Sequence, residues 1–290
     1  MKGKKALIQF FPKDPRSYQI AVLASLLVYG FFFLRFDLSG PQVLLSLGAV
    51  LVVQYVCTVL WKLPHYDPKS ALISGLSLCL LLRCNSLLLV FVAAVITIAS
   101  KFVIRWKGKH IFNPTNLGIV AMLLLTGQVW VSPGQWGNVA FFGFLMACLG
   151  GLVVNRASRS DVTYAFIFFY LAFVFGRSLY LGEPMAIPLH RLESGALLLF
   201  TFYMISDPKT TPNSRLGRII FGFLVAWGAW YIQFRMFRTN GVLWSLALFS
   251  MLVPVIDWIL PGKRYEWSHR GEIAILPREA TRPAPTAAIL

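Results

Sequence analysis

The sequence predicts an all-α polytopic membrane protein with about ten transmembrane segments, arranged as two inverted repeats of five. Apolar runs recur from residue 18 to residue 260. Charged residues make up 13% of the chain, against about 25% in a soluble domain. The basic residues lie in short loops between the apolar runs, which is the pattern that encodes membrane topology. This pattern accounts for the net charge of +16 and argues against nucleic-acid binding.

The apolar runs fall into two length classes. A crossing needs about 17–25 apolar residues, and seven runs satisfy this: 18–36, 42–61, 86–104, 137–154, 162–182, 217–236 and 242–260. Three shorter runs, at 71–82, 116–126 and 194–206, have polar residues at their entry or exit. We expect these three to form short, interrupted helices.

The distribution of basic residues supports ten crossings with both termini in the cytoplasm. If all ten runs cross and the N-terminus is inside, 21 of the 27 Lys and Arg residues lie on the cytoplasmic side. The chain then divides into a cytoplasmic segment 1–17, a membrane repeat 18–126, a second repeat 137–260 and a disordered cytoplasmic tail 261–290. The six basic residues on the outer side are Arg35, Arg83, Arg177, Arg191, Arg235 and Arg238.

A shared pattern relates the two repeats. "LISGLSLCLLL" (72–82) and "LESGALLLFTF" (192–202) place Ser74-Gly75 and Ser194-Gly195 exactly 120 residues apart. Each stretch is the third of five segments, and five is odd, so the second repeat enters from the opposite face. Interrupted helices of such inverted repeats meet near the midplane and form the ligand site. The alternative is a chance match of two Ser-Gly pairs.

Other site types are not indicated. The four cysteines lie in or beside apolar runs without a CxxC pair, which is typical of small buried hydrophobes. No metal-ligand spacing, P-loop, Rossmann glycine motif or Ser/His/Asp arrangement is present. The basic N-terminus has no h-region with a cleavage site, so a cleaved signal peptide is not expected.

The stretch "SDPKTTP" contains the first set of candidate site residues. Asp207 precedes a proline, and its side-chain oxygens are suited to accept local N–H groups in a turn. As a ligand site, Lys209, Thr210 and Thr211 would hold a phosphate or a ring carbonyl.

The stretch "KGKHIFNPTNLG" is the second candidate. Asn113 precedes a proline, which favours a turn, and Asn116 is expected to cap the helix that follows. Free N–H groups at such a helix start favour an anionic or electron-rich ligand. His110 is either a redox-linked proton carrier or a solvated loop residue. Near the end of the last span, Asp257 is expected to pair with Lys263 or Arg264, or else to act as an ion relay.

Two blocks carry a family resemblance: "GKHIFNP" and "FYMISDPKTTP". Over about residues 65–260 the chain resembles the family that contains the D subunit of the Rnf ferredoxin:NAD oxidoreductase and the B subunit of the sodium-pumping NADH:quinone oxidoreductase. The resemblance implies a ten-helix inverted repeat related to urea and ammonium transporters. It also implies a place in a bacterial inner-membrane complex for electron transfer and ion pumping, with flavin as the redox group.

The sequence departs from that family at the flavin attachment site. The family attaches FMN covalently to a Thr in an S-G-A-T-P-L-like loop, whereas the corresponding connection here is "TGQVWVSPGQWGN" (126–138). Neither Thr126 nor Ser132 matches the motif, so covalent FMN is not expected. The chain resembles a short, stand-alone branch of the family that includes membrane proteins found with enediyne biosynthesis.

Two hypotheses of different classes follow, together with a simpler third. The chain is an electron-transfer subunit with a non-covalent flavin (FMN or riboflavin) or a quinone, or a transporter or channel for a small solute or ion, or a scaffold for other subunits. Whether it is itself an enzyme is left open, and the lipid bilayer is an expected partner in each case. The candidate cofactor-binding residues are Ser74, Gly75, His110, Asn113, Asn116, Ser194, Gly195, Asp207, Lys209, Thr210 and Thr211.

Overall fold

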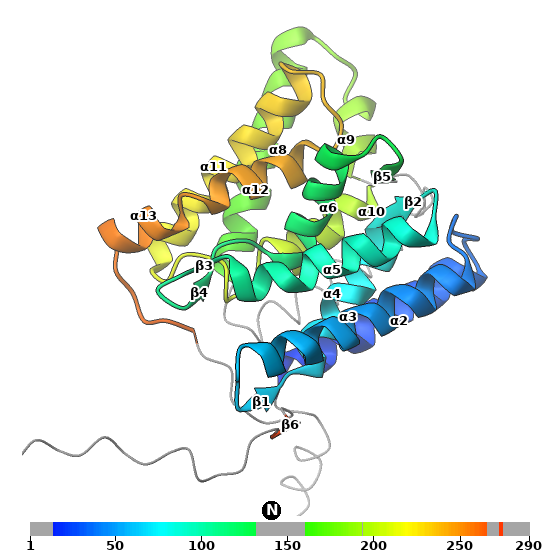
Figure 1. The fold of residues 1–290 in the computed structure, drawn as a ribbon. Coiled ribbons are helices and arrows are strands. Elements are labelled where there is room, and N and C mark those ends of the chain that lie inside the picture. Colours follow the sequence, from blue (N-terminus) through cyan, green and yellow to red (C-terminus); the bar gives the residue numbers. More distant parts are fainter. Residues whose placement is uncertain (1–13, 132–159, 193, 266–272, 275–290) are drawn as a thin grey trace, which may run out of the picture.

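The structure is a computed structural model that describes residues 14–131, 160–192, 194–265 and 273–274 (Figure 1). The predicted span 137–154 lies outside these residues, as do most of segment 1–17 and most of the tail 261–290. The structure therefore describes all of the first predicted repeat, 18–126, and only part of the second, 137–260.

The described part of the first half contains five helices. They are α2 (Pro15–Phe32), α3 (Gly40–Leu60), α4 (Pro68–Leu81), α5 (Leu87–Val103) and α6 (Pro114–Leu125). Helix α3 packs along α5, α4 packs against α2 and α3, and α6 packs against α5. Ser39 and Ser86 cap α3 and α5 by accepting backbone N–H groups, which fixes where each long helix begins.

The second half is centred on α11 (Arg215–Phe234). This helix packs along both α8 (Ser160–Leu181) and α12 (Gly241–Ser250). The short α10 (Gly195–Leu199) continues into the π-helix η1 (Phe200–Met204), which contacts α8. The described part of this half also contains helices α9 (Ala186–Leu192) and α13 (Val253–Ile259). Helix α12 contacts α6 of the first half.

The helices identify a helical membrane protein, as predicted. Among the described residues, α3, α8 and α11 have the length and apolar composition to cross a membrane. Helices α12 and α13 satisfy the same criteria only when taken together. The ten crossings remain a prediction.

The predicted span 242–260 is not one straight helix. Helices α12 and α13 are separated by Met251 and Leu252 and are bent by 50° relative to each other. Pro254 occupies the first turn of α13, where its missing N–H and fixed φ are tolerated and where it favours a new helix start.

The three predicted short helices are confirmed as α4, α6 and α10–η1. Helix α4 has 14 residues and is about 21 Å long, less than the roughly 30 Å of a bilayer core. The chain continues as the buried strand β2 (Leu82–Cys84), which pairs antiparallel with β5 (Val129–Val131) after α6. This pairing satisfies backbone groups of non-helical chain inside the protein, as membrane depth requires.

Two further strand pairs were not part of the all-α prediction. Strand β1 (His65–Tyr66) pairs with β6 (Ile273–Ala274), and β3 (Arg105–Trp106) pairs with β4 (Lys109–His110) in a hairpin. The hairpin turn residues Lys107 and Gly108 have φ of 47° and 75°. Positive φ at both positions is the requirement of a type I′ turn, which gives the two strands their twist.

The close contact between α5 and α6 gives a stability prediction. A Cβ on Gly118 would lie 1.9 Å from Oγ1 of the buried Thr97. We expect Gly118→Ala to destabilise the protein by about 1–3 kcal/mol through overpacking. Thermal unfolding of the purified protein in detergent measures this. In the matched control, Gly48→Ala in α3, the new Cβ meets nothing within 4 Å, so we expect equal or higher stability. Equal losses in both variants would contradict the packing argument.

Candidate functional site

The candidate site lies where the N-termini of three helices meet. Asp14, Asp67 and Asn113 cap α2, α4 and α6, each by accepting a backbone N–H with its side chain. All three helices continue with a proline in their first turn, a residue that favours helix starts. The sequence therefore fixes three helix starts, and the fold brings them together.

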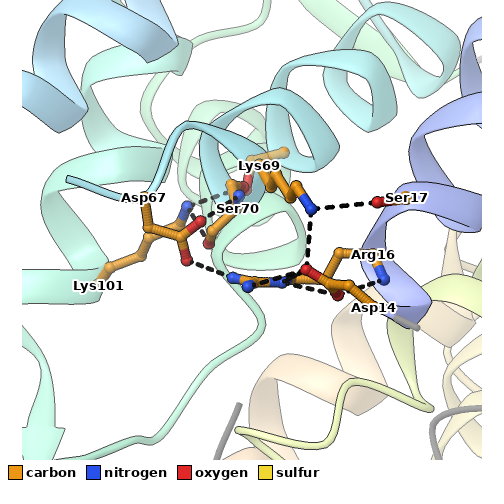
Figure 2. A network of polar contacts seen from close by, with 8 residues as sticks. Asp14, Arg16, Ser17, Asp67, Lys69, Ser70 and Lys101 are labelled. Carbon is orange, nitrogen blue, oxygen red and sulfur yellow. Dashed lines mark hydrogen bonds and ion pairs between the residues drawn. The ribbon is translucent and has the colours of Figure 1, made fainter. Parts of the chain in front are cut away.

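A network of ion pairs joins α2 to α4 (Figure 2). Arg16 is 2% exposed, and its Nη1 lies 2.8 Å from Oδ2 of Asp67 while its Nε donates to Asp14. Lys69 Nζ donates to Oδ2 of Asp14 at 3.0 Å and to Ser17. The two aspartates thus act as helix caps and as ion-pair partners, and they hold the two helix starts at a fixed separation.

Lys101 of α5 reaches the same region. Its side chain is buried, and its Nζ donates to the carbonyl and the hydroxyl of Ser70 at 3.1 and 3.0 Å (Figure 2). No carboxylate among the described residues lies within ion-pair distance of Lys101. A charged lysine with only neutral acceptors is unusual in a helix that lies in a membrane.

The turn after η1 has the geometry that its sequence predicts. The backbone carbonyl of Asp207 accepts the N–H groups of Thr210 and Thr211, and Oδ1 accepts the N–H of Lys209 at 3.0 Å. Asp207 therefore forms the predicted local turn. Thr210 and Thr211 are buried within it.

Two asparagines connect the halves of the protein. Asn113 Nδ2 donates to the carbonyl of Met204 at 3.3 Å and to Oδ2 of Asp207 at 3.4 Å. Asn116 is fully buried, and its Nδ2 donates to the carbonyl of Leu243 at 3.2 Å. At the start of α6, both asparagines thus donate a hydrogen bond to a backbone carbonyl of the second half.

The β3–β4 hairpin is anchored by Lys109. Its Nζ lies 2.6 Å from Oδ2 of Asp257 and also donates to the carbonyl of Thr211 and to Asn213. The prediction that Asp257 pairs with Lys263 or Arg264 is wrong, because the fold brings Lys109 to it from 148 residues away.

Two adjacent cavities, which share several lining residues, lie beside these residues. The larger, called the outer cavity, has a volume of about 430 Å³, and the smaller, called the inner cavity, has a volume of about 80 Å³. Both are lined by Lys101, His110 and Lys209. The inner cavity extends to Ser74, Asn113 and Asp207. The structure therefore gathers Ser74, His110, Asn113, Asp207 and Lys209 around one space.

The other predicted site residues lie elsewhere. Gly75 faces α3, where a Cβ would lie 2.7 Å from Val50. Ser194 caps α10 and lines a separate cavity of about 190 Å³, and Gly195 follows it at the first position of α10. Ser74, by contrast, lies within α4, so the shared Ser-Gly pattern occupies different positions in its two helices.

Two polar atoms at the inner cavity are suited to a ligand. Nδ1 of His110 and the hydroxyl of Tyr203 are buried and have no hydrogen-bond partner among the described residues. Burial, with the positive charges of Arg105, Lys209 and Lys101, lowers the pKa of His110 to about 3. The imidazole is therefore neutral at neutral pH, which suits a hydrogen-bond partner better than a proton carrier.

The pKa of Asp207 is shifted in the opposite direction from the pKa of the helix cap Asp14. Burial raises the pKa of Asp207 above its ordinary value, against the backbone N–H of Lys209 and the charges of Lys209 and Lys101. Its carboxylate therefore depends on these positive neighbours to stay ionised.

Sequence reasoning missed several residues that line the cavities. Lys101 was counted as a topology signal, although a lysine near the end of the apolar run 86–104 is itself a reason to expect a site. Tyr203 lies within an apolar run and has no sequence signal. Arg105 and Arg264 line the outer cavity from positions that are far apart in the chain.

Comparison with known proteins agrees with the resemblance. The model of the NQR2, RnfD, RnfE family matches residues 124–266. The match includes the "SDPKTTP" turn, whereas the "GKHIFNP" block lies before it, so for that block the resemblance remains a prediction.

Several curated relatives are named as the D subunit of an ion-translocating oxidoreductase complex. The protein of Erwinia tasmaniensis is 29% identical over 155 residues, which are 53% of this chain and 40% of the relative. Those of Pectobacterium carotovorum and Escherichia coli K12 are each 30% identical, over 49% of this chain and 38% of the relative. The matched part thus spans about two fifths of the length of these relatives.

The ion-pair network gives a pH prediction. Burial raises the pKa of Asp14, but hydrogen bonds from Arg16 and Lys69 outweigh this and hold it below its ordinary value of 3.8. The stabilisation by the Asp14 carboxylate is therefore complete above pH 3.8 and is lost as the pH falls through the lower folded-state pKa. We expect Asp14→Asn to destabilise the protein by about 3 kcal/mol at neutral pH and by progressively less in acid.

Thermal unfolding in detergent at several pH values measures this difference. The matched control is Asp37→Asn, because Asp37 is exposed and forms no ion pair among the described residues. A loss of stability in Asp14→Asn that does not change with pH would contradict the ion-pair argument.

Proposed function

We propose that this chain is an integral membrane subunit that supports electron transport coupled to ion movement across a bacterial inner membrane. The observation that carries the proposal is the family match over residues 124–266. The relatives named as subunits of an ion-translocating oxidoreductase complex add support, and other subunits of such a complex are the proposed partners.

The inverted repeat is part of the proposal, and the packing supports it. In the first half α3 packs along α5, and α5 packs against α6. In the second half α8 packs along α11, and α11 packs against α12. Each half also includes a short helix before the fourth segment, α4 in one and α10–η1 in the other. The repeated order of long and short helices is what two repeats of five segments require.

The proposed cofactor is a flavin, either FMN or riboflavin, or a quinone, held without a covalent bond in the adjacent cavities. Ligand pockets have volumes of about 300–1,000 Å³, so the outer cavity of about 430 Å³ suits a ring system and the inner one suits only its polar edge. His110 and Tyr203 have buried polar atoms that would bind that edge. Such a group would supply the electron acceptor and donor, while the protein positions it and excludes water.

A transporter or channel on the same fold is the second candidate. The adjacent cavities are lined by polar and charged side chains, as a solute pathway requires. A protein that binds no flavin or quinone and moves a solute into liposomes would favour this candidate over the redox role.

The spectrum of the purified protein tests the redox proposal. We expect visible flavin absorbance in mild detergent and release of that flavin into the supernatant by acid, because the connection 126–138 lacks the family's covalent attachment motif. For a colourless protein, riboflavin and quinone binding are measured by titration. We expect His110→Leu to bind the cofactor about tenfold more weakly, because a hydrogen bond to the imidazole is lost. His110→Gln, which keeps a polar side chain, should bind more tightly than His110→Leu. Absence of flavin and quinone binding in the wild-type protein would overturn the proposal.

The proposed topology is tested by labelling single cysteines in a background without native cysteines. Gln128 and Arg215 are both exposed, on the predicted outer and cytoplasmic sides. We expect Gln128→Cys to react with a membrane-impermeant maleimide in intact cells, and Arg215→Cys to react only in inverted vesicles. The reverse pattern would contradict the topology with cytoplasmic termini.

A further inference from the structure

The outer cavity has a strong excess of positive charge. Five Lys and Arg side chains line it, whereas Asp67 is the one carboxylate among its described lining residues. The five are Lys101, Arg105, Lys109, Lys209 and Arg264.

Two of the nearby carboxylates are already bound to other cations. Asp67 accepts Arg16 at 2.8 Å and caps α4, and Asp257 accepts Lys109 at 2.6 Å. Three cations remain without a carboxylate within ion-pair distance in the described structure: Lys101, Arg105 and Arg264. Their hydrogen bonds run to neutral oxygens.

The fold holds these three cations in place and leaves N–H groups available. Lys101 donates to Ser70, and Arg105 donates through Nε to the carbonyl of Lys101. Arg264 donates to the carbonyls of Lys107 and Gly108 at 3.1 and 2.6 Å, across the hairpin turn. An ammonium has three donor hydrogens and a guanidinium five, so each cation keeps unused donors.

Lys101 is buried, whereas Arg105 and Arg264 are exposed. Grouping like charges around one cavity is costly unless an anion compensates them. Arginine forks match the oxygen geometry of phosphate, and a phosphate monoester has a charge of about −1.5 to −2 at neutral pH, enough to compensate more than one cation. We propose that the outer cavity binds a phosphate group, held by Lys101, Arg105 and Arg264. The redox proposal does not require this site, because riboflavin and quinones, unlike FMN, have no phosphate.

The source of the phosphate is either a soluble molecule or the headgroup of an anionic lipid, and two experiments distinguish them. The first measures equilibrium binding of inorganic phosphate to the full-length protein in detergent, with chloride at equal ionic strength as reference. The second measures the lipid that stays bound in nanodiscs of phosphatidylcholine with and without phosphatidic acid. Saturable binding of inorganic phosphate supports a soluble source, and selective retention of phosphatidic acid alone supports a lipid source.

The variants Arg105→Gln and Arg264→Gln test the assigned residues. We expect each to weaken the binding found for the wild type about tenfold, as the loss of a charge-assisted hydrogen bond does. The matched control is Arg215→Gln, which removes the same charge from the same predicted face outside the cavity and should leave binding unchanged. Failure of both phosphate and phosphatidic acid to bind would overturn the proposal, as would equal weakening in all three variants. Riboflavin and quinone titrations of the same samples report on the redox proposal separately.

Discussion

A backbone polar group at membrane depth must find its partner inside the protein, and the rest of this structure depends on that constraint. Helices α4, α6 and α10–η1 are too short to cross a bilayer, so their ends cannot all reach water. The pairing of β2 with β5 satisfies extended chain at one end of α4 and α6. At the other end the capping side chains of Asp67 and Asn113 do the same. The site is thus a consequence of how short helices are terminated.

The same capping groups join distant parts of the chain. Asp67 caps a helix and holds Arg16, and Asn113 caps a helix and binds the carbonyl of Met204. Each of these side chains therefore serves local and tertiary structure at once. Removing one would leave a helix terminus without its cap and would also break a contact between two distant segments. These contacts also hold the residues that line the adjacent cavities in place.

Local patterns predicted more of this structure than long-range contacts did. The short helices and the turn at Asp207 follow from a few adjacent residues, and the structure has both. The cap of α6 was assigned to the wrong asparagine, because Asn113 caps the helix by accepting the N–H of Asn116. The partner of Asp257 was predicted wrongly, because proximity in sequence favoured Lys263 and Arg264 whereas the fold supplies Lys109. The break between α12 and α13 was also missed, since Pro254 lies in an apolar run that is long enough to cross. Of the candidate site residues, Ser194 lines a different cavity from His110 because equal spacing in sequence did not mean equal position in a helix.

The hairpin between α5 and α6 has a consequence for how the protein is made. Its turn is braced by Arg264 and its Lys109 is neutralised by Asp257, both of which are synthesised about 150 residues later than the hairpin. The hairpin therefore reaches its final contacts only after the second half of the chain has been synthesised.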